Sequence, residues 1–151
     1  MTGLLTLLGF DYGELRIGVA VGQTLTGTAT PLETVAVNNG KPDWARIDAL
    51  VGEWRPGALV VGDPLNMDGT SQPMTEAAGR FAATLAKRYR LPVYRADERL
   101  SSWVAKARLR NTRNLDPVAA QAILETWLSH HATGGTIDAT IPAASPGTES
   151  Q

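Results

Sequence analysis

Three acidic residues that are far apart in the sequence lie where strands or helices are expected to begin or end. Asp11 closes an apolar run in FDYG, Glu98 closes another in ADERL, and Asp116 opens a helical segment. Hydrolysis of a phosphodiester bond by two metal ions needs a few converging carboxylates that hold Mg²⁺ or Mn²⁺. Adjacent strand residues face opposite sides, so only one of Asp97 and Glu98 is expected at such a site; that choice stays open, and we favour Glu98. The spacing is compatible with a metal-dependent nuclease.

Each of these acids also has an ordinary structural explanation. Asp116 precedes Pro117, and an aspartate followed by a proline is a common way to begin a helix. Glu98 could form a surface ion pair with Arg99, and Asp11 could be a turn residue. An acid at the end of an otherwise apolar strand is harder to explain by a turn alone.

Five strands and four helices are expected around the acids. The expected strands are residues 4–12, 16–21, 29–37, 58–62 and 92–96. The expected helices are residues 44–54, a segment from Pro73, residues 102–110 and a segment from Asp116. The links among the first three strands are too short for a crossover helix, which predicts an antiparallel meander. We predict an α/β fold with a five-stranded mixed sheet flanked by helices, in the order βββαβαβαα.

Helical spacing of apolar residues predicts which helix faces are buried. The expected core positions are Trp44, Ile47, Val51 and Trp54, then Met74, Ala78, Phe81 and Leu85, then Ile123, Leu124, Trp127 and Leu128. Ser71 is the expected cap of the second helix. His130 and His131 are expected to interact with the dipole at the end of the last helix rather than to bind metal.

Length and composition indicate one domain. The chain has 151 residues, of which 43% are hydrophobic, and we predict one domain over residues 1–131 with a disordered tail over residues 132–151. There is no cysteine, which excludes disulfides and thiolate-bound metal sites. No stretch is long and apolar enough for a membrane span, and the N-terminus lacks the features of a signal peptide, so we expect a cytoplasmic protein.

Positive charge is concentrated in one stretch although the net charge is −1. Ten of the 14 Lys and Arg residues lie between Arg80 and Arg113, with two acids among them, which gives a local balance of +8. Binding to a phosphate backbone depends on local rather than total charge, so this stretch predicts a nucleic-acid partner. The alternative is that these residues are the solvated surface of helices.

Four segments together resemble the YqgF/RuvX family. They are FDYGELRIGVAVG, VGDPLNMDGT, DERLSS and DPVAAQAILETWL, and the resemblance runs from about residue 4 to residue 128. It implies a ribonuclease H-like fold and a nuclease. Members of the family have been described as Holliday junction resolvases and as nucleases that mature the 5′ end of pre-16S ribosomal RNA.

The resemblance also implies the residues of the site. Asp11, Glu98 and Asp116 match the expected metal ligands, with Mg²⁺ or Mn²⁺ as the cofactor. The expected substrate-binding residues are Arg16, Asn66, Thr70 and Arg99. The loop over residues 64–70 could meet a phosphate at the start of the next helix; the alternative is that it is only a well-formed turn.

Departures from the family pattern keep other functions open. Glu14 and Leu15 follow FDYG where the family usually has a small residue and a lysine, and Asp63 replaces an apolar residue. Asp63 could touch the metal site or weaken the approach of phosphate. We therefore weigh three functions: a nuclease for precursor ribosomal RNA, a resolvase of branched DNA, and a non-catalytic ribosome-assembly factor. Ribosomal particles are a further expected partner, and the chain could be a monomer or a homodimer, the latter being required for paired junction cuts.

Overall fold

A computed structural model describes residues 5–64, 68–70, 72–98, 116–133 and 136–137. The strands are β1 (Thr6–Tyr12), β2 (Arg16–Gln23), β3 (Thr28–Asn38), β4 (Lys41–Pro42), β5 (Ala58–Asp63), β6 (Val93–Asp97), β7 (Ala132–Thr133) and β8 (Thr136–Ile137). The helices are α1 (Trp44–Trp54), α2 (Pro73–Tyr89) and α4 (Asp116–His131). The helix expected over residues 102–110 lies outside the described residues.

The main sheet has the order β4-β3-β2-β1-β5-β6. The pairs β1–β2, β2–β3 and β3–β4 are antiparallel, while β5 is parallel to both β1 and β6. This confirms the predicted mixed sheet with an antiparallel meander. The sheet has one strand more than expected, because Asn39 and Gly40 form a two-residue turn with φ angles of 53° and 77°. Both angles suit the tight hairpin turns that Asn-Gly favours.

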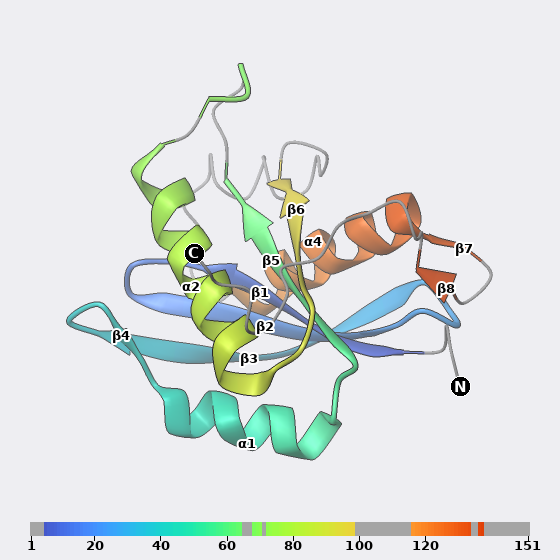
Figure 1. Ribbon diagram of the computed structural model, residues 1–151, viewed down its shortest axis with the longest axis horizontal. Helices are drawn as coiled ribbons and strands as arrows, with labels where there is room; N and C mark the ends of the chain where they lie inside the picture. The colour runs from blue at the N-terminus through green and yellow to red at the C-terminus, as the bar shows by residue number, and fades with distance from the viewer. Residues whose placement is uncertain (1–4, 65–67, 71, 99–115, 134–135, 138–151) are drawn as a thin grey trace.

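Helices cover both faces of the main sheet. In Figure 1, α1 and α2 lie on one face and α4 lies on the other. Side chains of β1 alternate between the two resulting cores: Leu8 and Phe10 pack with α1 and α2, whereas Leu7 packs with α4. This alternation fixes the face on which every other residue of the strand lies.

The helix faces follow the predicted spacing in most positions. All four predicted core residues of α4 are buried. In α1, Ile47 is buried as predicted, but Leu50 rather than Val51 or Trp54 is its second fully buried residue. The N-cap of α2 is Gln72, which forms a reciprocal capping box with Thr75. The residue that we expected to cap this helix, Ser71, lies outside the described residues.

The region after α4 contains a short hairpin of β7 and β8. The sequence did not predict this hairpin. Residues 138–151 lie outside the described part of the chain, so the predicted disorder of the tail stays a prediction. Within the described ranges, no helix has the length and apolarity needed to cross a membrane.

Candidate nuclease active site

Asp11 lies near the carboxyl end of β1, on the sheet face covered by α4. It follows the alternation of Leu7 and Gly9, and a Cβ on Gly9 would contact Leu124 of α4. The Asp11 side chain is buried, with 6% of its residue surface exposed. A carboxylate in this position is desolvated and has to be compensated by hydrogen bonds or by a positive charge.

The first residue of α4, Asp116, packs against the residue of β2 that pairs with Asp11. Gly18 pairs with Asp11 in the antiparallel register of β1 and β2. A Cβ built on Gly18 would stand 1.9 Å from the backbone oxygen of Asp116, so only glycine lets the start of α4 approach β2 this closely. The packing of α4 on a glycine therefore brings the Asp116 backbone to the strand position beside Asp11.

Glu98 reaches the same region from β6. Gly62 is the residue after Val61, the partner of Phe10, so it stands beside Asp11 on the neighbouring strand. A Cβ on Gly62 would lie 2.5 Å from Glu98 Oε2. Glu98 is 7% exposed, and its carboxylate therefore lies against the strand next to Asp11.

Asp97 points in the other direction. Ala96 belongs to the core on the α4 face, so strand alternation assigns Asp97 to the α2 face. Glu98 is the residue after β6, and its carboxylate lies beside Gly62, where Ile123 of α4 also packs. Of the two acids in DER, Glu98 is therefore the one that lies on the same face as Asp11. The main sheet thus brings the ends of β1, β5 and β6 together at one edge, as parallel strands do.

Asp116 forms an ion pair that the sequence analysis did not anticipate. Arg16 Nε donates to Asp116 Oδ2 at 3.0 Å, and both side chains are partly exposed. These residues are 100 positions apart, and only the packing of α4 on β2 brings them together. Within the described ranges, no three acidic or histidine side chains lie close enough together to hold one metal ion.

The loop before α2 is partly described. Thr70 donates through its hydroxyl and its backbone N–H to Asp68 Oδ1, at 2.6 and 3.0 Å. The carbonyl oxygen of Pro64 accepts a hydrogen bond from Thr75 in the first turn of α2, which ties the loop to the helix. The other predicted substrate contacts, Asn66 and Arg99, lie outside the described residues.

Asp63 does not share the face of the candidate site. Arg95 Nη2 donates to Asp63 Oδ1 at 2.9 Å and lies 3.4 Å from the carbonyl oxygen of Gly62. Strand alternation places Asp63 and Arg95 on the α2 face, opposite the face of Asp11. The expectation that Asp63 could touch the metal site was therefore wrong, because its carboxylate is bonded on the other side of the sheet.

The two histidines are remote from these acids. They end α4, which has 16 residues and begins at Asp116, so about 22 Å of helix separates His131 from that residue. His130 Nδ1 lies 2.8 Å from the carbonyl oxygen of Thr126. A position in the last turn is the one at which a histidine interacts favourably with the helix dipole.

Comparisons with known proteins agree on the type of domain. The family model described as "RuvX: Holliday junction resolvase" matches residues 5–130. A protein of Azotobacter vinelandii named "Putative pre-16S rRNA nuclease" is 50% identical, over 89% of this chain and all of the relative. A protein of the same name from Pseudomonas paraeruginosa is 49% identical, over 83% of this chain and 92% of the relative.

A solved structure shows the fold. It is the RuvC protein of T. thermophilus in complex with a Holliday junction substrate, with a TM-score of 0.55 and 20% identity. The match covers 81% of this chain and 91% of the RuvC chain. The domain accordingly has the ribonuclease H-like fold that the sequence predicted.

Proposed function

This chain belongs to the RuvX family, and from this premise we propose that it is a metal-dependent nuclease acting on precursor 16S ribosomal RNA. The family and its relatives carry the names of nucleases, which supports hydrolysis of phosphodiester bonds. The names mention neither a metal ion nor the 5′ end of the RNA, and our proposal adds both. The substrate follows the name that the curated relatives share.

One observation carries the proposal. Asp11 and Glu98 are buried acids at the ends of two different strands, on one face of the sheet, and the start of α4 adds Asp116 beside them. Carboxylates that end neighbouring strands on one face of a sheet lie where α/β domains bind their ligands. Carboxylate oxygens are also the donors that Mg²⁺ and Mn²⁺ prefer, so this placement supports a cation site.

The donor set fits Mg²⁺ or Mn²⁺. Both ions take carboxylate oxygens, and Mg²⁺ usually keeps several waters and uses only one or two protein carboxylates together with substrate phosphate. We assign Asp11 and Glu98 as the residues that would hold the ion. Asp116, which now bonds Arg16, would be a third carboxylate for the same ion. The bound ion would supply an activated water and would neutralise charge on the phosphate.

The chain's own residues then have distinct roles. Arg16 keeps the Asp116 carboxylate at the edge of the site and is itself exposed enough to meet a phosphate oxygen. Gly18 and Gly62 leave the space that Asp116 and Glu98 need, because a Cβ at either position would collide with these acids. In the first turn of α2, the N–H groups of Thr75 and Glu76 donate to the carbonyl oxygen of Gln72, so a phosphate site at the start of this helix stays a prediction.

Resolution of a four-way DNA junction is the second candidate function. It is favoured by the description of the family model, which names a Holliday junction resolvase. Two symmetric cuts require two active sites, so this function needs a dimer. The non-catalytic assembly factor was favoured by the acids Glu14 and Asp63. Asp63 no longer supports it, because its carboxylate bonds Arg95 on the other face of the sheet.

The test compares the wild-type protein with Asp11→Asn on a 5′-extended 16S precursor and on a synthetic four-way junction, in Mn²⁺, Mg²⁺ or EDTA. The variant keeps the shape of the side chain and removes the charge. Cutting should require metal and should be lost in the variant, as should Mn²⁺ binding measured by calorimetry. Glu53→Gln, which removes an exposed carboxylate on α1, is the control and should cut normally. Cutting in EDTA, or an Asp11→Asn variant as active as the wild type, would refute the proposal.

A further inference from the structure

A cavity lies on the face opposite the candidate active site. Its volume is about 450 Å³, and its walls come from the end of β1, the β3–β4 turn, the start of α1 and the middle of α2. Cavities of this size hold small-molecule ligands. Tyr12, the residue after Asp11, lines it, so the cavity adjoins the same end of β1 as the acids.

Aromatic rings form one wall of the cavity. The Phe81 ring is buried, with its centre 5.0 Å from that of Tyr12 and 5.7 Å from that of Trp44. Tyr12 and Trp44 are only partly buried, so parts of both residues remain open to solvent. Aromatic surface of this kind binds the flat face of a nucleobase regardless of its sequence.

Two cations stand on the rim. Lys41 and Arg80 line the cavity, and both are exposed. Neither forms an ion pair within the part of the chain that the structure describes, whereas Arg46 and Arg88 each bond a carboxylate. The rim is therefore positively charged beside an aromatic wall.

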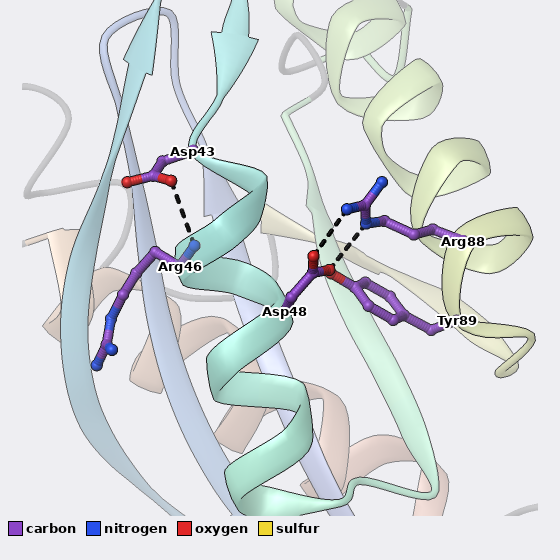
Figure 2. A network of polar contacts seen from close by, with 5 residues as sticks. All are labelled: Asp43, Arg46, Asp48, Arg88 and Tyr89. Atoms are coloured by element: carbon purple, nitrogen blue, oxygen red, sulfur yellow. Dashed lines mark hydrogen bonds and ion pairs between the residues drawn. The ribbon is translucent and has the colours of Figure 1, made fainter.

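The walls of the cavity are held by a polar network between α1 and α2. Figure 2 shows Asp48 of α1 between Arg88 and Tyr89 of α2. Both nitrogens of the Arg88 fork donate to Asp48 at 2.8 Å, and the guanidinium stands 4.9 Å from the centre of the Trp44 ring. These hydrogen bonds hold the pKa of Asp48 at about 2, below its ordinary value of 3.8. Asp48 therefore stays charged, and the network holds together, throughout the neutral range.

We propose that this cavity binds one nucleotide of a single-stranded segment of RNA, with the base against Tyr12 and Trp44 and the phosphate between Lys41 and Arg80. A concave aromatic site needs an unstacked base, which a single strand offers and a duplex does not. The idea that this strand leads to the scissile bond rests on the proposed function. Binding itself does not, because it needs neither metal nor cleavage.

The test measures binding of a fluorescein-labelled single-stranded oligouridylate by fluorescence anisotropy in EDTA. Tyr12→Leu removes the ring and keeps an apolar contact with Phe81. It should weaken binding by about 5- to 160-fold, the range for loss of one stacked base. Lys41→Ala with Arg80→Ala should weaken binding and lower the slope of log K against log salt by about 0.7, the value for one neutralised phosphate of a single strand.

Lys87→Ala is the matched control. It removes an exposed cation from the same helix that does not line the cavity, and it should change the affinity far less than Arg80→Ala. Equal losses in Lys87→Ala and Arg80→Ala, or unchanged affinity in Tyr12→Leu, would overturn the proposal. Circular dichroism establishes that each variant is folded.

The two proposals can fail separately. Binding of the oligouridylate is measured in EDTA, where no metal is bound and no RNA is cut, so it reports on the cavity and not on the active site. If the Tyr12 variant loses binding while Asp11→Asn still cuts RNA, the proposed binding cavity is supported and the assignment of the active site is refuted. If Asp11→Asn abolishes cutting while Tyr12→Leu binds normally, the reverse holds.

Discussion

Gly62→Ala should reduce catalysis far more than it reduces stability. The added methyl group would lie 2.5 Å from Glu98 Oε2 and 2.9 Å from Ile123 Cδ1. Both atoms are the ends of flexible side chains, so the fold can accommodate the methyl group by moving them. The carboxylate oxygen has to move by about 0.9 Å to reach the ordinary contact distance of 3.4 Å.

The magnitude of the two effects follows from that displacement. A misplacement of about 1 Å in a catalytic group can cost about 100-fold in rate. An extra methyl group in a packed region costs about 1–3 kcal/mol of unfolding free energy, and the flexible neighbours favour the lower end of that range. We therefore expect kcat for RNA cleavage to fall by about 100-fold in a protein that remains folded.

The assay is single-turnover cleavage of the 16S precursor, together with urea unfolding of the same preparations. Gly52→Ala is the matched control: it lies in α1 with no atom within 4 Å of the new Cβ. It should leave kcat unchanged and raise the unfolding free energy by about 0.5–1 kcal/mol, because alanine favours a helix. A folded Gly62→Ala protein with wild-type kcat would refute the assignment of Glu98 to the active site.

Three more predictions follow from the same region and from the helix network. Gly18→Ala should lower the unfolding free energy by more than about 3 kcal/mol or prevent folding. Its Cβ would stand 1.9 Å from the backbone oxygen of Asp116, and a backbone cannot move aside as a flexible side chain can. Urea unfolding measures the loss. Arg16→Ala should lower kcat, while its unfolding free energy falls by no more than about 1 kcal/mol, as in Arg46→Ala, which breaks an ion pair of similar exposure. Asp48→Asn should reduce the dependence of the unfolding free energy on pH below about 4. A carboxylate with a lowered pKa stabilises the fold above its ordinary pKa of 3.8 and loses that effect as the pH falls towards about 2. The wild type should therefore lose more unfolding free energy than the variant between these two pH values.

Strand boundaries and helix faces were predictable because they depend on local patterns. Apolar runs ending at turn residues marked β1 and β5, and helical spacing marked the buried residues of α4. Strand β4 was missed although Asn39-Gly40 carries the strongest short signal for a hairpin. The third predicted strand was ended at residue 37, where its apolar pattern ends. A strand of two residues is too short to show a periodicity from which it could be predicted.

The arrangement of the site required information that local patterns do not contain. Sequence reasoning could place Asp11 and Glu98 at strand ends. How close the two acids lie in space depends on the strand order, in which β5 lies between β1 and β6. The bond between Arg16 and Asp116 depends on how α4 crosses β2. The local traces of that crossing are Gly18 and Gly22, two glycines of an apolar strand where a Cβ would collide with α4. A glycine inside a strand often marks such a close approach.

Counting charge along the chain overstated the positive surface of the basic stretch. Arg88 and Arg95 were counted as free cations, but the fold gives each a carboxylate from another element, Asp48 of α1 and Asp63 of β5. Asp63 is thus neutralised on the α2 face and does not oppose phosphate at the acids on the α4 face. A residue such as Asp63, which differs from the family pattern but is paired within the fold, is therefore weak evidence against activity. The sign of a surface is set by which charges remain unpaired after folding, and a count of charges along the sequence cannot show that.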